Sequence, residues 1–305
     1  MTTVSAPSLA PALGPDRAGF LALLIGTTII SFSAIVVRFA DVGPVSSAAW
    51  RMIFALPALW IWTRYLASRR AVEPSRGALP VQIKVAIVLA GLAFAGDVAV
   101  FHMSLGATDI ANASFISNIA PILVMIGGAV FFSERPSAWI WGALCLALFG
   151  GWLMAGLVAP SALGRGDVFA VSAALFYAAY ILIMKQIRGR LDGPAATFWT
   201  AAVSAAVLVA AALWSDETFL PQSVQGWAAV IFLGLGSHAG GQGLTSIAVG
   251  RVPVGLVAIV SLTWAPMSAF WAWVVFHEQL NAFQMSGAAI ILGALVLTHP
   301  RWSRR

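Results

Sequence analysis

The sequence contains the same pattern of glycine, proline and arginine positions twice, and this duplication constrains the fold more than any other feature. Matching residues recur at nearly constant distance, 150 positions apart in one group and 145 in the other. The first group pairs Gly43-Pro44 with Gly193-Pro194 and Arg38 with Arg188, and the second pairs Pro121 with Pro266 and Gly142 with Gly287. The chain is therefore expected to fold as two related halves.

Ten apolar stretches make up most of the chain, each close to the roughly 20 residues that an α-helix needs to cross a hydrocarbon core. With 60% hydrophobic and 9% charged residues, the chain is far outside soluble composition, in which about a quarter of residues are charged. No alternating pattern typical of a β-barrel competes. The expected spans are 18–37, 46–66, 82–104, 110–132, 138–157, 167–187, 194–214, 226–248, 253–275 and 283–298. The predicted fold class is all-α, a polytopic membrane protein of ten transmembrane helices.

The two halves are expected to be inverted relative to each other. Each contains five spans, and an odd number forces the two copies to cross the bilayer in opposite directions. The half boundary is expected near 159–165, where Pro160 and Gly164 interrupt the apolar pattern. The N-terminal stretch lacks the cationic start and short apolar core of a cleaved signal, so it is read as a tail. The expected organisation is a tail over 1–17, a first five-helix repeat over 18–158, a second over 165–299, and a basic tail over 300–305.

The distribution of cations predicts an orientation. If the N-terminus is cytoplasmic, all but three of the 17 Lys and Arg residues fall on the cytoplasmic side, the exceptions being Arg38, Arg51 and Arg165. Cations near span ends resist translocation, so both termini are predicted to be cytoplasmic. The net charge of +6 then reflects orientation and anionic lipid, not a nucleic-acid partner.

Two prolines predict broken helices near the middle of the membrane. Pro121 and Pro266 lie near the centres of the fourth and ninth spans. Each removes a backbone donor and strains the preceding turn, which frees the carbonyls of Ser117 and Leu262. Broken backbone at this depth is tolerated where it faces protein or a water-filled cavity. Both prolines are therefore predicted to mark a central cavity.

Polar side chains and one tryptophan cluster at these two breaks. They are Ser114, Ser117 and Asn118 before the first proline, and Ser261, Thr263 and Trp264 before the second. Each hydroxyl or amide could alternatively form hydrogen bonds to the backbone groups that the kink leaves unpaired. The alternative role of Trp264 is packing in the core. For the cluster as a whole, the wall of a polar cavity is the favoured interpretation.

Two ionisable residues lie deep in counterpart spans. Asp97 is the carboxylate nearest the centre of a span, where a charge costs about 2.5 to 3.5 kcal/mol or more and marks function. The alternative is a neutral Asp97 bonded to a neighbouring helix. His238 lies in the eighth span at nearly the same depth. Asp97 and His238 are therefore expected to approach each other across the pseudo-twofold axis.

Three further residues are candidates for the cavity wall. Tyr177 and Tyr180 are three residues apart in the sixth span and share a helix face. Their rings have two open roles, stacking on an amphipathic substrate or packing in the core. Gln242 lies among five glycines of the eighth span, whose default role is close helix packing.

The order of these motifs resembles the drug/metabolite transporter superfamily, in particular its ten-helix EamA-type exporters. The matching features are Trp50-Arg51 at the head of the second span, Ala120-Pro121-Ile122 followed by Glu134-Arg135, and the later copy Ala265-Pro266-Met267 followed by Glu278. Two departures show that the halves have diverged. Trp199-Thr200 stands where the first half has Trp50-Arg51, and the spacing from Pro to Glu is thirteen residues in one half and twelve in the other. Within the superfamily, the plan is most similar to YddG-type exporters of aromatic amino acids.

The resemblance implies a secondary transporter of the bacterial inner membrane. Its expected cargo is a small amphipathic metabolite, with aromatic or other neutral amino acids leading, exported by alternating access between the halves. The sequence lacks the phosphate-binding G-x-x-x-x-G-K-[ST] motif, so ATP is not the expected driver, and protons are the candidate coupling ion. No cofactor or metal is expected, and no oligomer is required. The alternatives are a multidrug or cationic exporter that uses Asp97, an intramembrane enzyme, or a channel.

Overall fold

The computed structural model describes residues 17–69, 79–105, 107, 113, 116–155 and 164–298, without the side chains of residues 102, 105 and 298. The expected tails, apart from Arg17, lie outside these residues, as does Ser114. All described elements are helical, and they are α1 (Arg17–Val36), η1 (Val37–Phe39), α2 (Pro44–Arg69), α3 (Val81–Leu105), α5 (Ala120–Phe132), α6 (Ala138–Met154), α7 (Arg165–Arg188), α8 (Gly193–Trp214), α9 (Val224–Phe232), η2 (Leu233–Gln242), α10 (Gly243–Val249), α11 (Val254–Ser261), α12 (Trp264–Phe276) and α13 (Ala282–Thr298).

The described helices correspond to the ten expected spans, of which the fourth is described only in part, and they confirm the all-α membrane fold. Six are long and apolar enough to cross a membrane by length and composition, the last of them formed by α11 and α12 together. The shorter apolar helices α5, α6 and α13 belong to the fourth, fifth and tenth spans. The eighth span consists of α9, η2 and α10 in succession, and η2 is a ten-residue π-helix.

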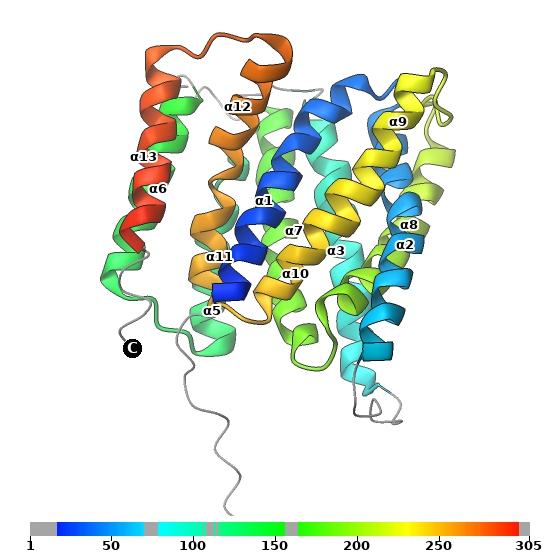
Figure 1. Ribbon diagram of the computed structural model, residues 1–305, viewed down its shortest axis with the longest axis horizontal. Helices are drawn as coiled ribbons and strands as arrows, with labels where there is room; N and C mark the ends of the chain where they lie inside the picture. Colours follow the sequence, from blue (N-terminus) through cyan, green and yellow to red (C-terminus); the bar gives the residue numbers. More distant parts are fainter. Residues whose placement is uncertain are drawn as a thin grey trace, which may run out of the picture.

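Helix packing shows the inverted repeat directly. Helix α3 packs along α7, and its counterpart span α9–η2–α10 packs along α1 in the same way. Helix α5 contacts α7 just as α12 contacts α1. Three contacts join a span to its own counterpart: α2 packs on α8, α5 of the fourth span on α11 of the ninth, and α6 on α13. The first four spans of each repeat therefore interleave around the centre, while α6 and α13 lie side by side at one edge (Figure 1).

Glycines permit the closest of these contacts. A Cβ atom added at Gly150 of α6 would lie 2.7 Å from the carbonyl oxygen of Gly287 in α13. A Cβ atom at Gly26 of α1 would lie equally close to the carbonyl oxygen of Gly241 in η2. Only small residues let helix backbones approach this closely in a membrane. Of the glycines in the eighth span, Gly234 and Gly243 pack against α2 and Gly241 packs against α1, which is the packing role that was their default interpretation.

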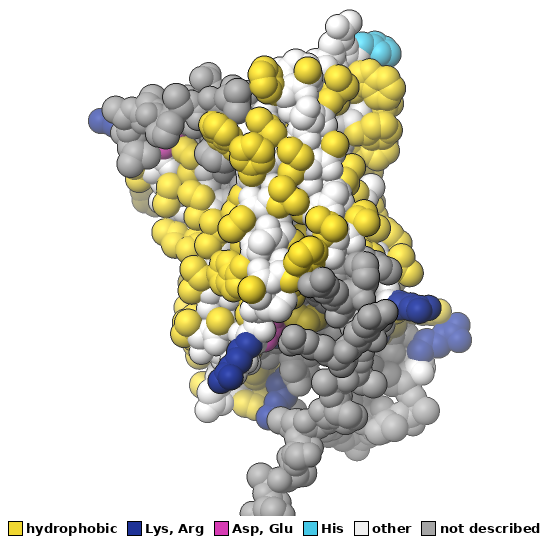
Figure 2. Space-filling model, turned by 90° about the vertical axis from the view of Figure 1, so that its left-hand side faces the viewer, with side chains coloured by type: hydrophobic (Ala, Val, Ile, Leu, Met, Phe, Trp, Pro, Cys, Tyr) yellow, Lys and Arg dark blue, Asp and Glu magenta, His cyan; other side chains and the backbone are white. Residues whose placement is uncertain are grey.

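The outer surface is apolar around the bundle and basic at one end. Figure 2 shows apolar side chains over the height of one side and most of the visible Lys and Arg side chains at its lower end. We call this end the basic face: it is the end where α1 begins, α7 ends and α11 begins. The described cations near it are Arg17, Arg64, Arg69, Lys84, Arg135, Lys185, Arg188, Arg190 and Arg251. The sequence predicts that the basic face is cytoplasmic.

Candidate functional site

A cavity of about 220 Å³ lies in the middle of the bundle. Both repeats build its wall: α1, α2, α3 and the turn before α5 come from the first, and α7, the η2–α10 span and the α11–α12 break come from the second. This is the place where an inverted-repeat membrane protein forms its ligand site.

Both prolines lie at interruptions of their spans. Residues 118–119 form a turn before α5, which begins at Ala120 and has Pro121 within its first two positions. In the ninth span α11 ends at Ser261 and α12 begins at Trp264, two residues before Pro266. Pro121 lines the cavity, whereas Pro266 is buried away from the wall. The carbonyl of Leu262 accepts a hydrogen bond from the Ala265 amide at 3.4 Å, so the break there is partly compensated by a tighter turn.

The hydroxyl groups next to the breaks satisfy backbone carbonyls. Ser117 donates to the Ala113 carbonyl at 2.9 Å, and Ser261 donates to the Val257 carbonyl at 2.7 Å. Thr263 donates to the Val260 carbonyl at 2.6 Å and is fully buried. Ser117 and Ser261 also line the cavity, where their oxygen atoms can still accept hydrogen bonds. Thr263 does not line it.

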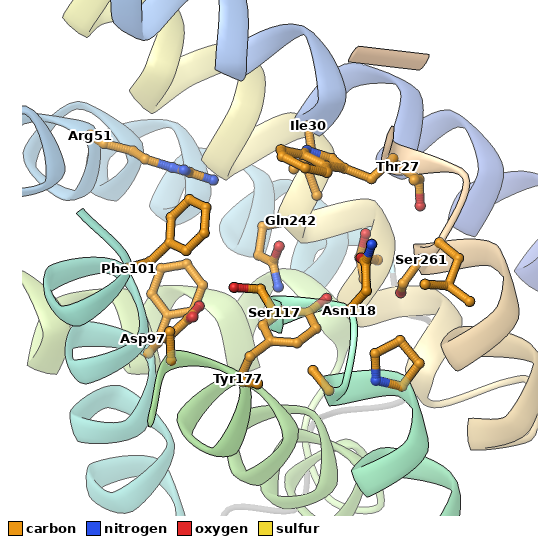
Figure 3. A pocket seen from close by; sticks show the side chains of 18 residues that line it. Thr27, Ile30, Arg51, Asp97, Phe101, Ser117, Asn118, Tyr177, Gln242 and Ser261 are labelled. Atoms are coloured by element: carbon orange, nitrogen blue, oxygen red, sulfur yellow. The ribbon is translucent and has the colours of Figure 1, made fainter. Parts of the chain in front are cut away.

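Two opposite charges enter the cavity from one side. Arg51 projects from α2 and Asp97 from α3, with Phe101 beside them (Figure 3). No ion pair within 4.0 Å joins the two groups. The Arg51 Nε atom is buried and has no hydrogen-bond partner within the described chain. The cavity therefore offers one cation and one carboxylate that are not paired with each other.

The position of Arg51 corrects the expectation that this residue lies on the outer side with Arg38 and Arg165. Helix α2 begins at Pro44, so Arg51 lies about 10 Å along the helix at 1.5 Å per residue. It faces the interior of the bundle instead of the headgroups. A cation two helical turns into an apolar span was the signal that could have placed it in the site, because such charges usually face a bundle interior.

Neutral groups occupy the far side of the cavity. Figure 3 shows Thr27, Asn118 and Ser261 opposite the two charges, with Ser117, Tyr177 and Gln242 between the two sides. Leu262 and Trp264, which flank the α11–α12 break, also line the wall. The cavity thus has a charged end and a neutral end of mixed apolar and hydroxyl character.

His238 and Tyr180 lie behind the wall. The Phe94 ring, which lines the cavity, packs 4.8 Å from the Tyr180 ring and 5.1 Å from the His238 ring. Tyr180 is 1% exposed, and its hydroxyl oxygen accepts a hydrogen bond from Gln242 Nε2 at 3.1 Å. His238 is also 1% exposed, and neither ring nitrogen has a partner in the described chain.

No hydrogen bond or ion pair joins His238 to Asp97 among the described residues, although the His238 ring packs against Phe94, three residues before Asp97 on α3. His238 is in the π-helical segment η2, where the chain turns with i to i+5 bonding. Side-chain directions there differ from those of an α-helix, so equal depth in counterpart spans does not give equal direction.

The structure therefore brings together most of the residues predicted for the site. The wall includes Asp97, Ser117, Asn118, Pro121, Tyr177, Gln242, Ser261 and Trp264. Four predicted residues lie outside it, namely Tyr180, His238, Thr263 and Pro266, and Ser114 lies outside the described residues. Wall residues that the sequence did not indicate include Thr27, Ile30, Arg51, Phe94, Phe101 and Thr245. Most of these are apolar or hydroxyl residues in continuous apolar helices, which carry no distinguishing pattern.

Comparisons with known proteins agree with this architecture. Residues 17–156 and 164–299 each match the EamA-like transporter family. The chain is 26% identical over 281 residues to the pseudopaline exporter CntI from two strains of Pseudomonas aeruginosa, covering 90% of this chain and 93% of each relative. A solved crystal structure superposes with a TM-score of 0.76 at 18% identity, covering 92% of this chain and 96% of the other, which shows a shared fold. Because the family matches both halves over nearly the whole length, this protein belongs to the EamA-like transporter family, within the drug/metabolite transporters.

Proposed function

We propose that this protein is a secondary transporter that exports small amphipathic metabolites, with aromatic or other neutral amino acids as the leading class. The observation that carries the proposal is the central cavity, whose wall is shared by two inverted repeats and includes both interrupted spans. When one repeat rocks against the other, a site at their interface becomes accessible from alternate sides of the membrane. Membership of a transporter family points to transport and away from an enzyme.

The named relative supports export of a small metabolite. It is described as an exporter of pseudopaline, not of aromatic amino acids. The resemblance to YddG-type exporters therefore remains a prediction about cargo. We favour amino acids because the wall contains an arginine and an aspartate beside aromatic and hydroxyl groups.

The alternative cargo is a toxic cation, and Asp97 in the wall favours it as a counterion. Two features weigh against that alternative. Arg51 lines the same end of the cavity and repels a monocation. The volume of about 220 Å³ is also below the roughly 300–1,000 Å³ of clefts that hold drug-sized ligands.

The test is flux in proteoliposomes that contain the purified protein. We expect saturable uptake of a labelled neutral amino acid, and faster uptake when the unlabelled compound is placed on the opposite side of the membrane. Such stimulation identifies a carrier, because its site must return across the membrane. Flux without saturation or stimulation would indicate a channel. Flux of a cationic dye combined with none of any amino acid would favour the alternative cargo.

Protons are the coupling ion that we propose. Asp97 is the carboxylate in the cavity wall, and His238 lies one layer behind it with both ring nitrogens free of described partners. A pH gradient imposed across the liposome membrane should drive uphill flux in the wild type. Undiminished gradient-driven flux in both Asp97→Asn and His238→Ala would rule out these two residues as the coupling site.

A further inference from the structure

We infer that the cavity binds the zwitterionic head of a free α-amino acid between Arg51 and Asp97, with the cargo side chain directed toward the α11–α12 break. This inference rests on the proposed function and deepens it, because it names the groups that bind the cargo. It starts from two charges that line one end of the cavity and do not pair with each other.

Arg51 is suited to a carboxylate. Its planar guanidinium offers a fork of donors that matches the two oxygens of a carboxylate. The Nε atom is buried without a partner, and no described carboxylate lies within 4.0 Å of the group. A buried charge is costly unless it is paired and hydrogen-bonded. A carboxylate brought by the cargo would supply an opposite charge for this guanidinium.

Asp97 is suited to an ammonium group. No described donor forms a hydrogen bond with its carboxylate, and the carboxylate lies at the cavity wall next to the aromatic ring of Phe101. Aromatic faces also attract an ammonium ion. Phe94 and Phe101 lie three and four residues from Asp97 on α3, so they share its helix face, and both line the cavity. The cavity thus has an acceptor and aromatic surface for a small cation at the same end as Arg51.

The two unpaired charges select a zwitterion over an ion of one sign. A monocation would pair with Asp97 and face Arg51, whereas a monoanion would pair with Arg51 and face Asp97. Removing a charge from water is repaid only when an opposite charge meets it in good geometry. An α-amino acid carries its carboxylate and ammonium on one carbon atom, so a single bound molecule can satisfy both groups.

The neutral end of the cavity sets the preference for the cargo side chain. Leu262 and Trp264, next to Ser261 at the α11–α12 break, supply apolar surface there, while Thr27 and Ser261 supply hydroxyl groups. No Lys, Arg, Asp or Glu other than Arg51 and Asp97 lines the described cavity wall. An apolar or aromatic side chain therefore fits, and a second carboxylate or ammonium on the cargo would lack an opposite partner.

The experiment measures competition against labelled phenylalanine in proteoliposomes. The two competitors are phenylalanine methyl ester, which lacks the carboxylate, and N-acetylphenylalanine, which lacks the ammonium group. For the wild type we expect each to compete at least tenfold more weakly than phenylalanine, as expected for loss of one charge-assisted hydrogen bond. Glutamate and lysine should also compete more weakly than phenylalanine or leucine.

The variants assign each head group to its residue. Arg51→Gln should bind phenylalanine more weakly and lose most of its discrimination against the methyl ester, while it keeps its discrimination against the N-acetyl compound. Asp97→Asn should show the reverse pattern. A residue with a purely structural role would weaken all competitors equally and leave both ratios unchanged. Arg165→Gln is the matched control, since Arg165 is exposed at the start of α7 and lies outside the wall.

The outcomes separate this inference from the proposed function. Saturable, trans-stimulated phenylalanine flux with equal competition by all three compounds would overturn the zwitterion site and leave the transporter proposal intact. Loss of both discriminations in either single variant would also overturn the assignment. If the wild type transports none of the amino acids, the amino-acid class itself fails. Folding of each variant is checked by its elution volume and unfolding temperature in detergent, and a folded variant with unchanged ratios contradicts the inference.

Discussion

The two faces of the bundle carry matched carboxylates that are held very differently. Glu134 follows α5 and Glu278 follows α12, and each comes directly after a residue with left-handed backbone, Ser133 at φ 54° and His277 at φ 56°. Glu134 forms an ion pair with Lys185, and its other oxygen accepts a hydrogen bond from the Val254 amide at 2.9 Å. We call this set of contacts the basic-face latch.

At the opposite face, Glu278 forms an ion pair with Arg38, with 2.6 Å between Arg38 Nη1 and Glu278 Oε1. We call this pair the opposite-face latch. Arg38 also lies over the ring of Phe276, 5.0 Å from its centroid. Both charged side chains are about half exposed, at 47% and 48%, against 19% and 20% in the basic-face latch. The duplicated positions have thus kept a latch at each end while its burial has diverged.

This difference indicates which end of the protein is held closed more firmly. The basic-face latch ties the end of α5 in the first repeat to α7 and to the start of α11 in the second. The positive end of the α11 dipole adds to its attraction for Glu134. An exposed ion pair contributes at most about 1 kcal/mol. We therefore expect the resting protein to be closed at the basic face and to open more readily at the other.

The largest effect is expected from Glu134→Gln. This change leaves the mostly buried Lys185 without its partner, and breaking a buried pair costs up to about 3–5 kcal/mol. The basic face should open in the resting state, so a cysteine in the wall should become reactive from that face. The measurement is maleimide labelling of Thr245→Cys in a Cys145→Ala background, in membrane vesicles of each sidedness. We expect labelling from the basic face to rise more than tenfold, and an unchanged rate would contradict the latch.

A smaller effect is expected when both partners of that latch are removed. In the double variant Glu134→Gln with Lys185→Met, no unpaired charge remains, and replacing a buried pair with neutral groups is often nearly neutral. In this double variant, the labelling rate from the basic face should be lower than in Glu134→Gln and closer to the wild-type rate. The same assay measures the coupling between the two sites. Additive effects of the two changes would show that the ion pair itself does not hold the face closed.

A still smaller effect is expected at the opposite face. Glu278→Gln should change labelling from that face less than about fivefold, because exposed ion pairs contribute about 0–1 kcal/mol. Salt screens exposed charges strongly and buried ones weakly. Raising the salt concentration to about 1 M should therefore remove the difference in labelling rate between Glu278→Gln and the wild type. The difference in labelling rate between Glu134→Gln and the wild type should remain. Equal salt sensitivity at both faces would erase the proposed difference between the latches.

The fold could be predicted from the sequence further than the site. Ten spans follow from apolar runs of sufficient length, and the interruptions near Pro121 and Pro266 follow from the chemistry of one residue type; both signals are local. The direction of a side chain within a span is not local. Counting cations by position in the chain placed Arg51 with the outer charges, although its helix turns it inward. His238 likewise lies buried outside the cavity wall, in the π-helical segment η2, which the apolar pattern of the eighth span does not indicate.

The smallest effect concerns acid stability at the opposite face. Asp41, in the connector before α2, accepts a hydrogen bond from the Gln222 amide at 3.1 Å. The hydroxyl of Ser223 at the start of α9, together with this amide, lowers the pKa of Asp41 below its ordinary value of 3.8. A carboxyl group whose pKa is lower in the folded state stabilises the fold above its unfolded pKa. That contribution is lost as the pH falls through the lower, folded value.

The wild type should therefore lose stability between about pH 4 and the lower pKa of folded Asp41, and Asp41→Asn should lose less over the same interval. The measurement is the unfolding temperature in detergent as a function of pH, with Asp216→Asn as the control in the neighbouring connector after α8. Because Asp41 is exposed, the difference should be small and should shrink in salt. Identical pH profiles for Asp41→Asn and the wild type would show that the hydrogen bonds of Asp41 do not stabilise the start of α9.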